Sequence, residues 1–174
     1  MPTNLTNQYL INTEYSTYRY PGTIGSIISR QYRFCAFECT ALANLPCGVF
    51  VTMSADAMAG NKVKPLSAAN DKVFGVSMYN GNIIYDFDAA TQNYIYPKDS
   101  IVSLIEEGDV FMFAEKAVAA GDDVYARHTA DAGNTRIGAL SNAAGTGLVL
   151  IPGAKFLKAI ASPGVTQVSL PDLI

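Results

Sequence analysis

The sequence predicts a mainly β protein, a small β-barrel or sandwich built from two related β units, with an extended N-terminal arm. Three observations support this fold class. A short pattern centred on a glycine occurs twice, apolar segments of strand length recur about every 8 to 12 residues between turn residues, and no segment sustains a capped helical period. A chain of 174 residues can form one such body with its own hydrophobic core.

The repeated pattern reads as a small residue, a glycine, two variable positions and a valine. It occupies Cys47–Val51 and again Ala120–Val124, and each copy is followed by a further apolar segment, Val73–Val76 and Phe156–Ile160 respectively. A glycine after a small residue suits a tight turn with positive φ, and a β-branched residue suits a strand. The pattern therefore predicts two related β units, with a chance recurrence of a short motif as the alternative.

Residues 1–30 differ from the rest, being rich in Asn, Thr, Ser and Tyr and nearly free of charge. Pro21, Gly22 and Gly25 interrupt any regular element. We expect an extended arm over 1–30, lying on the protein's own body or on another chain, followed by a β-rich body over 31–174. A frayed tail or an ordinary edge strand is the alternative. The residues expected to make the arm's contacts are Tyr9, Tyr15, Tyr18, Tyr20 and Pro21.

Alternating and apolar segments predict the strands of the first half of the body. Asn80-Gly81 predicts a type I′ hairpin turn after one of them, and Pro65 marks another as a short outer strand. In chain order the expected strands are Tyr32–Thr40, Val49–Met53, Lys62–Leu66, Val73–Tyr79, Ile83–Phe87 and Tyr94–Tyr96.

In the second half, a hairpin turn at Glu106–Asp109 is expected because charged residues and a glycine separate two apolar segments. Ser162–Gly164 is expected to form the last turn, and Ala114–Ala120 is the one place where a helical turn would fit. The expected strands are Ile101–Ile105, Val110–Phe113, Val124–Arg127, Arg136–Ala139, Lys155–Ala161 and Val165–Leu170.

Hydrophobic residues make up 49% of the chain and charged residues only 16%, against about 25% in typical soluble domains. A surface this poor in charge indicates that a partner covers part of it. The net charge of −3 and the scattered Lys and Arg residues argue against a nucleic-acid binder. No apolar stretch approaches the roughly 20 residues of a membrane span, and the N-terminus does not read as a secretory signal.

The cysteines Cys35, Cys39 and Cys47 are odd in number, which favours reduced thiols. In a strand over Gln31–Thr40, Cys35 and Cys39 would share one face with Phe37. We interpret the cysteines as small core residues, because a zinc site would need a fourth ligand that the pattern does not supply.

No catalytic, cofactor-binding or metal-binding residue is predicted. The single histidine, His128, lies in a polar stretch without a partner motif for nucleophilic catalysis. Asp86 and Asp88 are spaced like the start of a calcium loop, but the required glycine and closing glutamate are missing. Gly145–Gly147 lacks the third glycine and the following helix of a dinucleotide site. The protein is therefore not expected to be an enzyme.

The chain resembles the capsid decoration, or structural cement, proteins of tailed bacteriophages. The resemblance rests on the two glycine-centred units and above all on Glu107–Tyr125, which contains the run Ala-Val-Ala-Ala-Gly-Asp-Asp-Val-Tyr. Phe156–Ile160 and Val165–Leu170 also fit. Together these segments extend over about residues 45 to 170 and leave out the first 30.

The resemblance implies a β-rich protein made in the host cytoplasm that binds the outer surface of the phage head. Such proteins commonly form homotrimers and bridge major capsid protein subunits, with no cofactor, nucleic acid or membrane. The arm would then contact the capsid protein or a sister subunit. Two alternatives stay open: a receptor- or glycan-binding module of a phage tail or fibre, and a hydrolase using His128 or a carboxylate pair.

Overall fold

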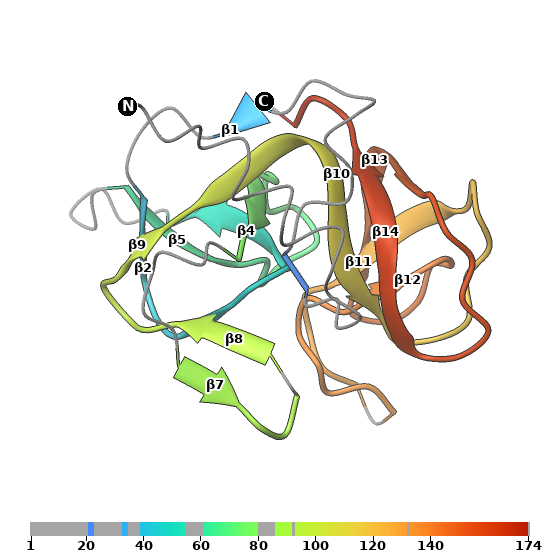
Figure 1. The fold of residues 1–174 in the computed structure, drawn as a ribbon, viewed down its shortest axis with the longest axis horizontal. Coiled ribbons are helices and arrows are strands. Elements are labelled where there is room, and N and C mark those ends of the chain that lie inside the picture. Colours follow the sequence, from blue (N-terminus) through green and yellow to red (C-terminus); the bar gives the residue numbers. More distant parts are fainter. Residues whose placement is uncertain are drawn as a thin grey trace, which may run out of the picture.

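The computed structural model describes residues 21–22, 33–34, 39–54, 61–79, 86–91, 93–131 and 133–173. Regular structure in these ranges consists of β-strands, which confirms the predicted mainly β class, and no helix occurs in them (Figure 1). Consequently the described part of the chain contains no helix that is long and apolar enough to cross a membrane.

Most strands are short, and the longest is β10, with 11 residues. The strands are β1 (Arg33–Phe34), β2 (Cys39–Ala41), β3 (Leu45–Pro46), β4 (Phe50–Met53), β5 (Lys62–Pro65), β6 (Gly75–Ser77), β7 (Asp86–Asp88), β8 (Asn93–Tyr96), β9 (Ile101–Val102), β10 (Leu104–Ala114), β11 (Asp123–Arg127), β12 (Leu140–Ser141), β13 (Leu148–Phe156) and β14 (Gly164–Leu170).

The C-terminal half forms a closed barrel. Its strands are hydrogen-bonded in the order β10-β14-β13-β11-β12, and β12 returns to β10 to close the ring. Every pairing is antiparallel except that between β10 and β12, which is parallel. We call this ring the second barrel; it lies on the right in Figure 1.

The N-terminal half repeats the same ring. Its strands pair in the order β10-β6-β4-β5-β2-β9, and the ring closes because β9 and β10 are consecutive segments separated only by Ser103. Here too one pairing, between β2 and β5, is parallel and the others are antiparallel. We call this ring the first barrel (left in Figure 1).

The two barrels match strand by strand. In chain order β2, β4, β5, β6 and β9–β10 of the first barrel make the same pairings as β10, β11, β12, β13 and β14 of the second. The repeated turns match as well: Gly48 N–H donates to the carbonyl of Ser77, and Gly121 N–H donates to the carbonyl of Phe156. Gly48 and Gly121 have φ values of 71° and 89°. The two related β units predicted from the sequence are therefore present.

Strand β10 belongs to both barrels, which corrects the hairpin predicted at Glu106–Asp109. The strand is continuous over 11 residues, pairing with β6 at Leu104 and Ile105 and with β14 from Gly108 to Ala114. Glu106 and Asp109 are buried within it. Gly108, with φ of 123°, permits the irregular backbone where the strand passes between the barrels. The composition resembled a turn, but long-range pairing keeps the chain extended.

Three other sequence predictions are wrong in detail. Strand β13 starts at Leu148 and runs through Pro152 and Gly153, rather than starting at Lys155; these two residues lie where the register against β11 shifts, a bulge that tolerates proline. The strand near Arg136–Ala139 is displaced to Leu140–Ser141. The helical turn is absent, since Val118 within 114–120 forms an isolated bridge with Ile160 instead.

Strand β5 was expected to be an outer strand, and this is also wrong. It is hydrogen-bonded to β4 on one side and to β2 on the other. Its proline is tolerated because β2 pairs only with Lys62 and Val63, while Pro65 faces Val51 of β4 alone.

The core has two parts, and β4 contributes to both. Val51 belongs to the cluster inside the first barrel, with Cys39 and Cys47 among its fully buried members. Phe50 belongs to the larger cluster that contains the interior of the second barrel. Alternating side chains of one strand thus connect the barrels. Two cysteines are confirmed as buried free thiols, and burial raises the pKa of Cys47; Cys35 lies outside the described residues.

A small sheet of β3, β8 and β7 is added to the first barrel. Strands β7 and β8 belong to the long connection between β6 and β9, and β3 lies between β2 and β4. The connection between β13 and β14, which is equivalent to the one between β6 and β9, is only residues 157–163. Figure 1 shows β7 and β8 at the lower left, extending from the body. The predicted strand at Tyr94–Tyr96 is confirmed within β8, while Asn80-Gly81 lies outside the described residues.

Candidate interaction surface

Of the five arm residues predicted to make contacts, the structure describes Pro21. Tyr9, Tyr15, Tyr18 and Tyr20 lie outside the described residues. Pro21 and Gly22 are buried against the protein's own body: Gly22 N–H donates to the carbonyl of Phe111 at 2.6 Å, and its carbonyl accepts from Tyr79 N–H at 3.0 Å. The chain is therefore fixed to its body at residues 21–22, within the segment assigned to the arm.

The approach of this segment to the first repeated turn is close. A Cβ added to Gly22 would lie 2.8 Å from the backbone nitrogen of Gly48, and a Cβ added to Gly48 would lie 2.4 Å from the backbone nitrogen of Gly22. Both glycines also have positive φ. Glycine is required at both positions because backbone, not a movable side chain, occupies the space.

The residues considered for chemistry have local structural contacts. His128 Nδ1 lies 2.8 Å from the hydroxyl oxygen of its neighbour Thr129. Asp88 accepts hydrogen bonds from Ala90 N–H and Thr91 Oγ1–H, so it shapes the turn after β7. Over the described part of the chain, no group of three His, Cys, Asp or Glu side chains is arranged to hold a metal ion.

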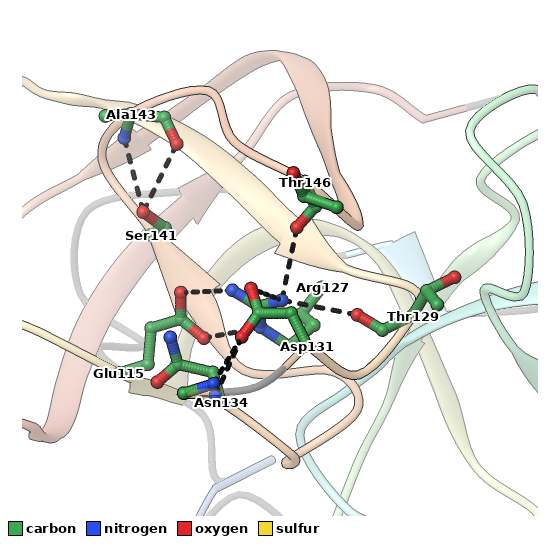
Figure 2. A network of polar contacts seen from close by, with 9 residues as sticks. Glu115, Arg127, Thr129, Asp131, Asn134, Ser141, Ala143 and Thr146 are labelled. Carbon is green, nitrogen blue, oxygen red and sulfur yellow. Dashed lines mark hydrogen bonds and ion pairs between the residues drawn. The ribbon is translucent and has the colours of Figure 1, made fainter.

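A buried polar network holds the long loop between β11 and β12 to the second barrel (Figure 2). Arg127, at the end of β11, makes two hydrogen bonds to Glu115, from Nε at 2.7 Å and from Nη2 at 2.8 Å. Its Nη1 reaches Asp131 at 2.9 Å and the carbonyls of Thr129 and Thr146. The Arg127 side chain is only 2% exposed and that of Glu115 only 8%.

The charged side chains in this network stabilise one another. Hydrogen bonding to Glu115 raises the pKa of Arg127. Backbone hydrogen bonds from Gly133 and Asn134, together with the charge of Arg127, lower the pKa of Asp131. The sequence offered no sign of the pairing, because Glu115 and Arg127 meet only when β10 and β11 enter the same barrel.

Beside this network a surface depression of about 530 Å³ lies where four parts of the chain meet. They are the turn of the β7–β8 hairpin, the end of β10 with Phe113 and the following Glu115, the loop carrying Asn134 and Arg136, and Pro163 between β13 and β14. The Arg136 guanidinium covers the Phe113 ring, 3.9 Å from its centroid, and Nη1 donates to the carbonyl of Thr91 at 3.3 Å. The sequence pattern predicts a strand at Arg136 and gives no indication of these side-chain contacts.

Comparisons with known proteins agree with this architecture. The structure is similar to a chain of "The capsid of Myoviridae Phage XM1", with a TM-score of 0.65, 17% identity, and coverage of 92% of this chain and 97% of that one. At this identity the similarity shows the shared fold. No curated protein sequence matches the chain. The family described as structural cement protein (E217 gp24/Pam3 gp6) matches residues 10–171. The chain therefore belongs to the family of phage structural cement proteins.

Proposed function

We propose that this protein binds the outer surface of a phage head and stabilises it by bridging neighbouring major capsid protein subunits. The observation that carries the proposal is the cement-family match, which extends over residues 10–171 and therefore includes both barrels. Synthesis in the host cytoplasm, assembly on the virion and a homotrimeric arrangement belong to the same proposal. The low charged fraction of 16% supports it, because apolar surface is available for contacts between chains.

The body has the stiffness that a bridge between subunits requires. The barrels share β10 and are also in contact through the loop before β12, where a Cβ on Gly138 would lie 2.3 Å from Val49 Cγ1. Residues 21–22 add hydrogen bonds to Phe111 and Tyr79. Because packed interiors deform little, a load on one barrel passes to the other.

Stabilisation of the shell would follow from mass action. A protein that binds the assembled shell and not its separated subunits shifts the equilibrium towards the shell. Each copy can bind weakly, since contacts to two subunits at once raise the effective affinity. Nothing in this mechanism requires a reaction, and we propose that the protein is not an enzyme.

We further propose that residues 1–30 act as an arm on the body at 31–174. The rings of Tyr9, Tyr15, Tyr18 and Tyr20 would contact the capsid protein or a sister subunit. The contact of Pro21 and Gly22 with the body supports this, because it shows where the segment assigned to the arm is joined to the body. Tyrosine is enriched among the residues that dominate binding at interfaces.

The test is reconstitution on expanded phage heads that lack this protein. We expect the purified protein to bind at a fixed number of copies per head and to raise the temperature at which heads rupture. A particle reconstruction should show density bridging capsid subunits on the outside. His128→Ala should bind equally well. Failure to bind, or density on the tail or fibres instead, would refute the proposal, and the second result would favour the receptor-binding alternative.

A further inference from the structure

Among the residues that the structure describes, Arg136 has no ion-pair partner. In the part of the chain that the structure describes, its contacts are the Thr91 carbonyl and the face of the Phe113 ring, and no carboxylate forms an ion pair with it. The guanidinium carries five N–H donors, and one is used. Arg136 also lines the depression of about 530 Å³.

Two carboxylates that act near Arg136, those of Glu115 and Asp88, accept their hydrogen bonds from other residues. Glu115, which also lines the depression, receives two hydrogen bonds from Arg127. Asp88 accepts from Ala90 and Thr91 in the hairpin turn, and its charge acts on Arg136 from outside hydrogen-bonding distance. The fold therefore places the Arg136 cation at this surface, while the carboxylates of Glu115 and Asp88 hydrogen-bond to other residues.

Arg127 and Arg136 provide an internal comparison. Arg127 is buried with two carboxylates, and hydrogen bonding to Glu115 raises its pKa. Burial instead lowers the pKa of Arg136, and the charge of Asp88 opposes this only in part. A cation that is partly removed from water and has no ion-pair partner is stabilised when an anion binds to it. Arg127 therefore has a structural role, whereas no described carboxylate neutralises the charge of Arg136.

The neighbouring surface is suited to a protein. Phe87, on the same hairpin, is 54% exposed and packs edge-on against Tyr94, with ring centroids 5.3 Å apart. Arginine and aromatic side chains are enriched in the central part of protein interfaces. A nucleic acid or other polyanion is disfavoured by the net charge of −3 and by the single arginine in the depression.

We propose that the depression at Arg136 is the subsite that receives one Asp or Glu side chain of the capsid protein, with Arg136 as its bidentate partner. The inference rests on the proposed function and adds to it the place and chemistry of one contact. Arg136 is positioned for this by its stacking on Phe113, which fixes the guanidinium plane, and by its hydrogen bond to Thr91.

The first experiment measures binding to expanded heads that lack the protein. Arg136→Ala should weaken binding about 10- to 100-fold and Arg136→Glu further, since an interfacial charge pair is lost and then reversed. Lys72→Ala, which removes an exposed positive charge on the first barrel, is the matched control and should bind as the parent does. Thermal melting of each variant verifies the fold.

The second experiment uses Arg136→Lys, which keeps the charge and supplies an amine. Carbodiimide treatment of decorated heads should join position 136 to an Asp or Glu of the capsid protein by an amide bond, identified by mass spectrometry. Parent-like binding by folded Arg136→Ala and Arg136→Glu, or a link at 136 to a second copy of this chain, would overturn the inference while leaving capsid binding intact. Failure of the parent protein to bind heads would instead refute the proposed function, and the inference with it.

Discussion

Ala41 and Ala114 occupy the same position in the two barrels. Each is fully buried and lies at the one parallel pairing of its ring, Ala41 opposite Val63 and Ala114 opposite Leu140. The residue after each alanine donates its N–H to that partner's carbonyl, from Leu42 at 2.9 Å and from Glu115 at 2.8 Å. The barrels thus close in the same way, and the small side chain is part of the closure.

Enlarging either alanine should destabilise the protein. Ala41→Val and Ala114→Val add methyl groups to a filled barrel interior, and each should lower the free energy of unfolding by about 1–3 kcal/mol. Chemical denaturation measures the change. Ala144→Val, at an exposed loop position, is the control and should have little effect. Equal stability of the three variants would show that the parallel pairing tolerates larger residues.

The two repeated turns should respond differently to the same substitution. Gly48→Ala and Gly121→Ala both place a side chain at positive φ, which costs roughly 1–2 kcal/mol. A Cβ at Gly121 meets no atom within 4 Å, whereas one at Gly48 would meet Pro21 and the Gly22 backbone. Gly48→Ala should therefore lower the unfolding free energy substantially more. Thermal denaturation of both variants checks this, and a larger loss at Gly121 would contradict it.

The buried pair of Arg127 and Glu115 should show strong coupling. Arg127→Met leaves the Glu115 carboxylate buried without its partner, which should cost about 3–5 kcal/mol of stability. Adding Glu115→Leu removes the uncompensated charge and should recover part of the loss. Denaturation of the two single variants and the double variant completes the cycle. Additive losses would show that the pair does not act as a unit.

The stability of the fold should depend less on pH when Asp131 is replaced. Its pKa is lowered in the folded protein, so the carboxylate stabilises the fold above its unfolded pKa of about 3.9, and this contribution disappears as the pH falls through the folded value. Asp131→Asn should be less stable at neutral pH and lose less stability on acidification. Melting temperatures from about pH 7 to pH 3 test the slope. Asp86→Asn, the same charge change on exposed β7, is the control, and parallel curves for parent and Asp131→Asn would contradict the prediction.

Removing the tyrosine-containing part of the arm should separate attachment from folding. Deletion of residues 2–20 keeps Pro21 and Gly22, and Gly22 hydrogen-bonds to the body, so the melting transition should change little while fewer copies remain on washed heads. Deletion of residues 2–22 removes those bonds as well and should lower the melting temperature. Full decoration by the shorter deletion would show that the tyrosines are not anchors, and its failure to fold would move the boundary of the body.

The sequence determined what depends on neighbouring residues. Local conformation and side-chain type predict the glycine turns at Gly48 and Gly121, the strand after each turn, and the burial of Cys39 and Cys47. These features are enough to predict the β class and the duplication. The resemblance to cement proteins rested on the same local patterns, chiefly Glu107–Tyr125, and the family match confirmed it.

Tertiary structure decided which segments pair and which charges are buried. Glu106–Asp109 has the composition of a turn, yet remains extended because β6 and β14 hydrogen-bond to the same strand on either side of the junction. The ion pair of Arg127 with Glu115 forms only once the barrels have closed. The same holds for the depression at Arg136, where no described carboxylate pairs with the guanidinium. Strand pairing and the desolvation of charged side chains depend on residues far apart in the chain, so local sequence patterns do not predict them.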